Sequence, residues 1–225
     1  MQQTTFLPAL SSRAGAKLEL RGGGWIRFFE GAFESHESLM ARLLDELPLR
    51  VEEVVVFGKR HPTPRRTSWH GDPGCAYAYS GRHFEPLPWT AGLREVRGVL
   101  RELTGTAFNS VLANHYRDGS DAMGAHADDE KELGPEPDDI RIASVSLGAA
   151  RRFVLEHQQT REKREWSLGG GDVLLMGGPL QRQWRHRVPR TKKRVGARLN
   201  LTFRVVLRGP TIGPTCLDSS RRTSR

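Results

Sequence analysis

Hydrophobic positions along the chain follow two periods, and each period predicts one kind of element. In Glu37–Leu47 and in Leu93–Leu103, apolar residues recur three and four positions apart, which is typical of amphipathic helices. From Ala107 onward they form short runs separated by turn residues, which predicts strands. The strands predicted in this second half are Ser110–Tyr116, Ile140–Leu147, Arg152–Glu156, Asp172–Met176, Gln183–Val188 and Ala197–Leu207.

The first half of the chain contains fewer recognisable strands. Gly24–Phe33 predicts a short strand, and Val54–Lys59 is a β-rich run interrupted by glycine, as at the tip of a hairpin. The segment His61–Gly81 is rich in proline, glycine and tryptophan. We interpret it as a long ordered loop with one strand, Ala76–Ser80.

Together these elements predict an α+β fold, in which two helices flank a β-sandwich or jelly roll. With 225 residues, the chain is long enough for one domain with a sizeable core. We expect this domain to span residues 23–208, between tails at residues 1–22 and 209–225.

The last predicted strand has the most informative pattern. Side chains alternate between the two faces of a strand, so one face is entirely apolar and the other is polar and cationic. An inner strand tolerates two guanidinium groups when they line a polar cavity; a solvated face of an edge strand is the alternative. The apolar face contains Leu199, Leu201, Phe203, Val205 and Leu207, and the polar face contains Arg198, Asn200, Thr202 and Arg204.

Charge is unevenly distributed along the chain. Lys and Arg number 35 against 26 Asp and Glu, which gives a net charge of +9. Ten of the basic residues, and no acidic one, lie between Asp172 and Asp218. Such a stretch predicts a surface that attracts a polyanion such as nucleic acid, although a solvated basic face has the same composition.

Composition also argues against other classes of protein. No run of about 18 apolar residues is present, so no membrane span is expected. The segment Met1–Leu20 lacks the apolar stretch of a secretory signal. Two cysteines, Cys75 and Cys216, are too few for a disulfide framework or a cysteine-built zinc site. We therefore expect an intracellular protein, cytoplasmic in a bacterium or nuclear in a eukaryote.

The motif His-x-Asp occurs twice, and iron(II) oxygenases hold their metal with two histidines and one carboxylate. His70 and Asp72 lie among prolines and glycines, where an aspartate more often organises a turn. His126 and Asp128 follow two glycine turns, and on a strand side chains two positions apart can reach one ion. His186, in a predicted strand, can supply the third ligand.

The two arginines of the last strand indicate how a second ligand could bind. Arginine pairs with a carboxylate through two parallel hydrogen bonds. Arg198 and Arg204 are about 20 Å apart along a strand, and inward-leaning side chains with a five-carbon diacid between them can close that gap. The spacing therefore permits 2-oxoglutarate as a ligand.

These motifs together resemble the AlkB family of iron(II)/2-oxoglutarate-dependent dioxygenases. The resemblance extends from about Val54 to Val206 and implies a double-stranded β-helix (jelly-roll) catalytic core at residues 107–208. It also implies a nucleotide-recognition region at residues 54–106. The matching residues are His126-Ala127-Asp128, His186, Arg198–Arg204 and Asn114-His115-Tyr116.

The resemblance implies a role for each matching residue. His126, Asp128 and His186 would hold Fe(II) and form the catalytic centre. Arg198 would bind the distal carboxylate of 2-oxoglutarate, and Arg204 the end that chelates the iron. The residues that would support this cosubstrate are Asn114, Tyr116, Asn200 and Thr202.

Other motifs resemble the AlkB homologues that repair duplex DNA, namely Val56-Phe57-Gly58-Lys59, Pro64-Arg65 and Tyr77-Ala78-Tyr79-Ser80-Gly81. Phe57 would fill the gap left by a flipped base, and Arg65 would lie near the vacated site or its phosphates. Tyr79 and His126 would stack on the damaged base. Further substrate contacts would come from Tyr77, Ser80, Asp129 and Glu130, whose two carboxylates would favour a cationic base. The alternatives are a buried hairpin aromatic for Phe57 and a core strand face for Tyr77 and Tyr79.

The implied reaction is direct oxidative demethylation of N1-methyladenine and N3-methylcytosine in DNA. It consumes O2 and 2-oxoglutarate and releases formaldehyde, succinate and CO2. We expect a monomeric enzyme whose partner is DNA, duplex in preference to single-stranded, and which does not bind membranes. The alternatives are an AlkB-type demethylase of RNA or single strands, a 2-oxoglutarate oxygenase of another substrate, and a non-catalytic nucleic-acid-binding module.

Overall fold

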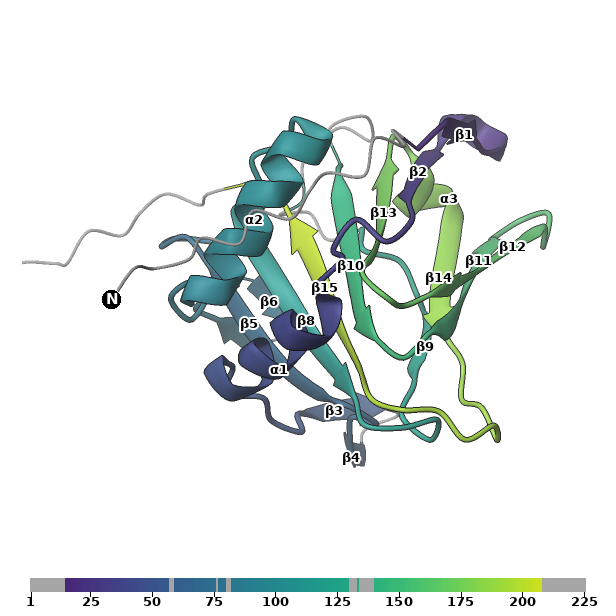
Figure 1. Cartoon of the computed structure of the whole chain (residues 1–225). Helices are drawn as coiled ribbons and strands as arrows, with labels where there is room; N and C mark the ends of the chain where they lie inside the picture. The colour runs from purple at the N-terminus through teal and green to yellow at the C-terminus, as the bar shows by residue number, and fades with distance from the viewer. Residues whose placement is uncertain are drawn as a thin grey trace, which may run out of the picture.

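A computed structural model describes residues 15–56, 59–75, 77–79, 82–129, 133 and 140–207. Two antiparallel β-sheets face each other, and two helices cover the outer face of the larger sheet (Figure 1). This arrangement is the predicted α+β jelly roll.

The larger sheet has seven strands, and the smaller sheet has four. In spatial order, the larger sheet consists of β1 (Lys17–Glu19), β2 (Trp25–Phe29), β13 (Asp172–Gly177), β10 (Ile142–Gly148), β15 (Arg198–Arg204), β8 (Ser110–Tyr116) and β5 (Arg66–Gly71). The smaller sheet consists of β12 (Lys163–Leu168), β11 (Arg151–His157), β14 (Trp184–Val188) and β9 (Met123–His126).

Besides two long helices, the elements outside the two large sheets are two hairpins and two short helices. The hairpins pair β3 (Glu53–Val56) with β4 (Lys59–Pro62) and β6 (Tyr77–Tyr79) with β7 (Arg82–Phe84). The short helices are the 3-10 helix η1 (Arg21–Gly23) and α3 (Leu180–Gln183), which precedes β14.

The long helices α1 (His36–Glu46) and α2 (Ala91–Thr104) confirm the two predicted helices. The Thr90 side chain caps α2 by accepting a hydrogen bond from the Leu93 backbone N–H at 3.3 Å, and Gly105 ends the helix in the left-handed region at φ 69°. Their apolar faces pack with one face of the larger sheet into a core that includes Leu43, Leu93 and other buried side chains. No helix in the described part of the chain is long and apolar enough to cross a membrane.

The strand predictions for the second half of the chain are confirmed to within a few residues, and β8 has the predicted bounds. The prediction of a loop at His61–Gly81 is wrong over Arg66–Gly71. These six residues form β5 at the edge of the larger sheet, paired with β8. Its buried side chains include Thr67, Ser68 and His70, so the segment lacks the apolar alternation by which strands are recognised. Pairing with a distant strand decides its structure. The patterns also missed β9 and β12 of the smaller sheet.

Candidate metal and cosubstrate pocket

A pocket lies between the two sheets, and both sheets contribute side chains to it. One wall comes from β8, β10, β13 and β15 of the larger sheet, and the opposite wall from β9, β11 and β14 of the smaller sheet. The lining residues are Leu112, Asn114, Tyr116, Met123, His126, Asp128, Ser144, Phe153, Met176, His186, Val188, Arg198, Asn200, Thr202 and Arg204.

Strand β15 divides its side chains as the alternation predicted. It lies inside the larger sheet, between β10 and β8, so it is not an edge strand. Leu199, Leu201 and Phe203 are fully buried against the helices, while the four polar residues of the other face line the pocket. The two arginines of this strand are therefore held inside the protein, which is compatible with burial because the pocket wall is polar.

His126, Asp128 and His186 converge at one end of the pocket. His126 ends β9 and pairs across the smaller sheet with His186 on β14, and their ring centroids are 4.2 Å apart. The Asp128 carboxylate oxygens lie 3.7 Å from His126 Nε2 and 3.8 Å from His186 Nε2. Among the described residues this is the group of histidine and carboxylate side chains that could hold a metal ion.

These three residues fit a divalent metal of the iron(II) type. The distances between the Asp128 carboxylate and the two Nε2 atoms are too long for hydrogen bonds but short enough for one ion to bridge them. Asp128 Oδ2 and His186 Nδ1 are buried and have no hydrogen-bond partner in the described structure. Two imidazoles and one carboxylate are the donor set of non-haem iron oxygenases, which leaves coordination positions for other ligands.

The charge of Asp128 is balanced by a buried arginine. Arg204 donates a hydrogen bond from Nη2 to Asp128 Oδ1 at 2.7 Å, and both side chains are only 3% exposed. Burial alone would raise the pKa of Asp128. The positive charge of the Arg204 guanidinium is the largest effect opposing burial, and the pKa of Asp128 lies below its usual range. Asp128 is therefore the ionised carboxylate that metal binding requires.

The two histidines have different environments. His186 is buried, and burial, with His126 and Arg204 nearby, lowers its pKa to about 3 against the opposing effect of Asp128. A neutral imidazole is the form that ligates metals, so the pocket keeps His186 ready to bind. The His126 side chain is 30% exposed, at the mouth of the pocket.

The opposite end of the pocket is built around Arg198. This side chain is 1% exposed, and its Nη2 donates to Ser146 Oγ at 2.7 Å. Its Nε and Nη1 atoms are buried and have no hydrogen-bond partner in the described structure. The Arg198 guanidinium also lies 5.3 Å from the centre of the Tyr116 ring. The end of the pocket away from the metal residues therefore has a cation with donors available for a carboxylate.

Amide and hydroxyl groups line the wall between these two ends. Asn200 Nδ2 donates to Ser144 Oγ at 2.8 Å, and Thr202 Oγ1 donates to Asn200 Oδ1 at 3.1 Å. Asn114 Oδ1 accepts a hydrogen bond at 2.7 Å from Nε of Arg65. The structure thus brings together all nine residues predicted to bind the metal and the cosubstrate.

The predicted DNA contacts are placed less completely. Tyr77 and Tyr79 lie on β6, in register with Phe84 and Arg82 of β7. Asp129 is exposed directly after the metal residues. Phe57, Ser80 and Glu130 lie outside the described residues.

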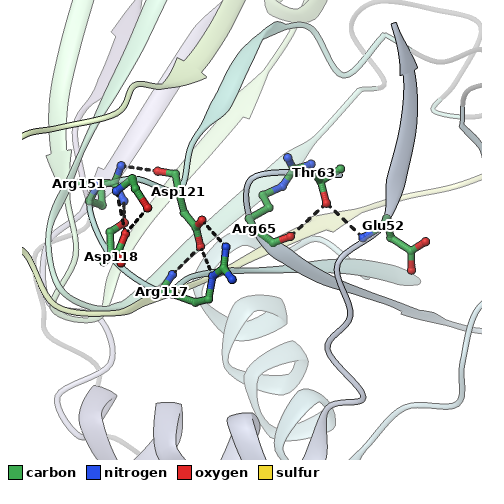
Figure 2. Close-up of polar contacts among 8 residues, drawn as sticks. Glu52, Thr63, Arg65, Arg117, Asp118, Asp121 and Arg151 are labelled. Carbon is green, nitrogen blue, oxygen red and sulfur yellow. Dashed lines mark hydrogen bonds and ion pairs between the residues drawn. The ribbon is translucent and has the colours of Figure 1, made fainter. Parts of the chain in front are cut away.

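Arg65 was predicted to lie near the vacated site of the flipped base or its phosphates, and the structure gives its surroundings without DNA. Arg65 is only 6% exposed, and it contacts Asn114 in the pocket wall. Its backbone carbonyl accepts a hydrogen bond from Thr63, whose hydroxyl also accepts the Glu52 backbone N–H (Figure 2). In this structure Arg65 supports the pocket from within the protein.

The other His-x-Asp motif, His70-Gly71-Asp72, lies outside the metal site and stabilises the local fold. His70 is buried in β5, and its ring nitrogens bond to the Pro88 carbonyl at 2.8 Å and the Ser68 hydroxyl at 2.7 Å. The Asp72 carboxylate accepts hydrogen bonds from Trp89 and Arg97. These partners hold the start of α2 against β5.

Several buried polar residues in and around the pocket were not predicted from the sequence. Ser144 and Ser146 lie on β10 at alternate positions facing β15, so the alternation of this strand could have identified them. Gln181 is 1% exposed, and its Oε1 accepts the Asp128 backbone N–H at 3.2 Å. Arg151, behind Tyr116, is also buried. Neither of these last two has a signal in the sequence.

Comparison with known proteins agrees with this geometry. A model described as "2OG-Fe(II) oxygenase superfamily" matches residues 26–204, so the chain belongs to that superfamily. It is 42% identical to the "DNA oxidative demethylase ALKBH2" of Mus musculus over 69% of this chain and 67% of that protein. The human ALKBH2 protein is also 42% identical, over 68% of this chain and 61% of its own length. The chain thus belongs to the AlkB family.

More divergent members of the family show the same relationship. "Alpha-ketoglutarate-dependent dioxygenase alkB homolog 3" of Rattus norvegicus is 35% identical over 78% of this chain and 61% of that protein. The aligned part of the chain thus spans about three fifths to two thirds of the curated relatives described here. The solved structure of OsALKBH1 is 18% identical and has a TM-score of 0.59, over 83% of this chain and the whole of that one. At this identity it supports the fold alone.

Proposed function

We propose that this protein is a DNA-repair dioxygenase that removes the methyl group from N1-methyladenine and N3-methylcytosine in DNA. The observation that carries the proposal is the pocket between the sheets, where a two-histidine, one-carboxylate group lies at one end and a buried arginine with available donors at the other. The relatives named as DNA oxidative demethylases support DNA as the substrate.

In this proposal His126, Asp128 and His186 hold Fe(II), and 2-oxoglutarate lies along the polar wall. Iron, 2-oxoglutarate and O2 supply the oxidising chemistry that hydroxylates the N-methyl group, after which formaldehyde leaves. Arg198 binds the distal carboxylate, and Arg204 lies beside Asp128 at the iron end. Asn114, Tyr116, Asn200 and Thr202 fix the orientation of the cosubstrate.

The substrate side of the site follows from the same proposal. A flipped base would stack between Tyr79 and the exposed edge of His126, as enzymes that act on a base remove it from the helix. Tyr77, Ser80, Asp129 and Glu130 would contact its polar edge, and the carboxylates favour N1-methyladenine and N3-methylcytosine because these bases are cationic. Phe57 would fill the gap in the duplex, and Arg65 would lie near the vacated site or its phosphates.

We also propose the organisation around this chemistry. The proposed catalytic domain begins before the predicted residue 23, because β1 (Lys17–Glu19) is a strand of the larger sheet, and it extends to about residue 208. Residues 54–106 would recognise the nucleotide, and residues 107–208 would supply most of the jelly roll, to which β1, β2 and β5 add strands. The enzyme acts as a monomer on duplex DNA, in the cytoplasm of a bacterium or the nucleus of a eukaryote.

The experiment that tests this function is formaldehyde release from a duplex oligonucleotide with a single N1-methyladenine. We expect release that requires both Fe(II) and 2-oxoglutarate and that is lost in His126→Ala. His36→Ala, at the start of α1 and on the helical side of the larger sheet, is the matched control and should retain activity. Full demethylation by His126→Ala would refute the proposed site.

The same assay separates the alternatives. Succinate formation without formaldehyde from this duplex would show that the protein is a 2-oxoglutarate oxygenase with a different substrate. RNA, single-stranded nucleic acid and protein would then be tested as substrates. Absence of both products would favour a binding module. For the duplex preference, Phe57→Ala should reduce activity on duplex DNA much more than on the same single strand, and an equal loss on both would exclude a wedge role.

A further inference from the structure

Arg151, the first residue of β11, is a buried arginine that the proposed chemistry leaves without a role. It is 2% exposed. Its Nη1 donates to the Asp118 carbonyl at 2.8 Å, and its Nη2 donates to the carbonyls of Asp121 and Pro189 at 2.8 and 2.9 Å. These are main-chain acceptors without a full charge, so they satisfy the donors of Arg151 but leave its net positive charge in place.

The nearest acidic side chains have other partners. Asp121 forms a two-pronged pair with Arg117, at 2.8 Å to both Nε and Nη2 (Figure 2). Asp118 accepts hydrogen bonds from Ser120. Among the described residues no ion pair within 4 Å joins Arg151 to a carboxylate, although Tyr116 and the carboxylates of Asp121 and Asp118 partly oppose the lowering of its pKa by burial. Burying a charge without a close ion-pair partner costs free energy, so the position of Arg151 needs an explanation.

The charge of Arg151 lies close to the proposed cosubstrate end of the pocket. Its guanidinium carbon is 5.6 Å from the centre of the Tyr116 ring, and that of Arg198 is 5.3 Å from the same ring. The two guanidinium carbons are therefore at most about 11 Å apart, and an aromatic ring, which screens charge poorly, contacts both. Burial lowers the pKa of Arg198 most, Tyr116 opposes this effect, and the nearby charge of Arg151 adds to the lowering. Two like charges in one buried region favour an anion between or beside them.

We infer that Arg151 is a positioning residue that selects a cosubstrate with a second carboxylate. Arg151 does not contact the second carboxylate. Its positive charge adds to that of Arg198 across the Tyr116 ring. The binding site therefore favours a dicarboxylate over a 2-oxo acid with one carboxylate. The inference rests on the proposed function, because it takes Arg198 as the anchor of the distal carboxylate of 2-oxoglutarate.

The structure also gives Arg151 a purely structural alternative. The carbonyls of Asp118 and Asp121 precede β9, which carries His126, and the Pro189 carbonyl follows β14, which carries His186. If Arg151 only joins these segments, its loss disturbs the metal site and weakens every ligand alike. Selectivity between two ligands that differ only in the distal carboxylate separates the two roles.

The test compares 2-oxoglutarate with 2-oxopentanoate, which has a methyl group in place of the second carboxylate. Dissociation constants are measured by calorimetry on the manganese-loaded protein without DNA, with competition for the weaker ligand. Arg151→Gln removes the charge and keeps an amide donor, Arg151→Met removes both, and Arg151→Lys keeps the charge. Arg152→Gln is the matched control, because its side chain is the next on the strand and is exposed.

The Arg151 and Arg198 guanidinium carbons are at most about 11 Å apart, and a carboxylate held by Arg198 would lie at a comparable distance from Arg151. Two unit charges about 10 Å apart at an effective dielectric constant of about 20 change a binding constant roughly tenfold. We therefore expect Arg151→Gln to weaken 2-oxoglutarate binding about tenfold and to leave 2-oxopentanoate within about twofold of wild type. Arg151→Lys and Arg152→Gln should keep the wild-type preference. The ratio of the two constants is internal to one preparation, so a partly unfolded variant changes the number of sites and not the ratio.

Equal weakening of both ligands, or an unchanged ratio in both neutral variants, would overturn the selectivity role. The failure of the proposed function has a different signature: wild-type protein would then show no preference for 2-oxoglutarate, and Arg198→Gln would leave the ratio unchanged. A wild-type preference that depends on Arg198 but not on Arg151 refutes this inference alone.

Discussion

Asp128→Ala and His126→Ala should abolish activity alike but should affect the stability of the metal-free protein very differently. Both residues belong to the proposed metal site, so each substitution removes a ligand. Their surroundings differ: the Asp128 side chain is 3% exposed and paired with Arg204 at 2.7 Å, whereas the His126 side chain is 30% exposed. Replacing Asp128 leaves the buried Arg204 charge without its carboxylate.

The expected magnitudes follow from burial. Removing one partner of a buried, hydrogen-bonded ion pair costs about 3–5 kcal/mol of unfolding free energy. Truncating a partly exposed side chain that contacts one other ring costs about 1 kcal/mol or less. With a urea m-value of about 3 kcal/mol/M for a chain of this size, Asp128→Ala should lower the unfolding midpoint by about 1–1.7 M, and His126→Ala by about 0.3 M or less.

The measurement is urea unfolding of both variants and the wild type in the presence of EDTA, with circular dichroism as the signal. Chelation removes the contribution of bound metal, which would otherwise stabilise only the wild type. Formaldehyde release under metal-replete conditions checks that both variants are inactive. Equal midpoints for the two variants would show that the Asp128–Arg204 pair contributes no more than an exposed histidine, and the argument from burial would be wrong.

Three further predictions follow from single contacts. Gln181→Leu removes the acceptor of the Asp128 backbone N–H and should weaken metal binding about 10–100-fold in a direct titration; unchanged affinity would exclude a positioning role. His70→Gln should flatten the pH dependence of stability: burial lowers the pKa of His70, so the unfolded chain takes up its proton first and stability falls as pH drops below about 6.5. Urea unfolding at pH 7 and pH 5 checks this, with a slope change of up to about 1.4 kcal/mol per pH unit, and an unaltered slope contradicts it. Arg65→Met removes the donor to Asn114 and should raise KM for 2-oxoglutarate several-fold with little effect on KM for DNA, and the reverse pattern would favour a phosphate contact.

Periodicity and spacing in the sequence were sufficient for the main elements and the central site. The polar face of Arg198–Arg204 could be predicted because a strand alternates its side chains strictly, and two arginines on one face have few tolerable environments. His126 and Asp128 could be paired because they are two residues apart. The two long helices followed from the spacing of their apolar residues, which burial against the sheet requires.

Tertiary structure decided what depends on distant partners. Arg66–Gly71 is a strand because it pairs with β8, and its own residues carry no strand pattern. The ion pair of Asp128 with Arg204 joins residues 76 positions apart, and Gln181 reaches Asp128 across 53. The position of Arg151 against the Tyr116 ring likewise depends on segments that are distant in the sequence. A sequence displays local periodicity directly, whereas the environment of a buried charge depends on which segments the folded backbone brings around it.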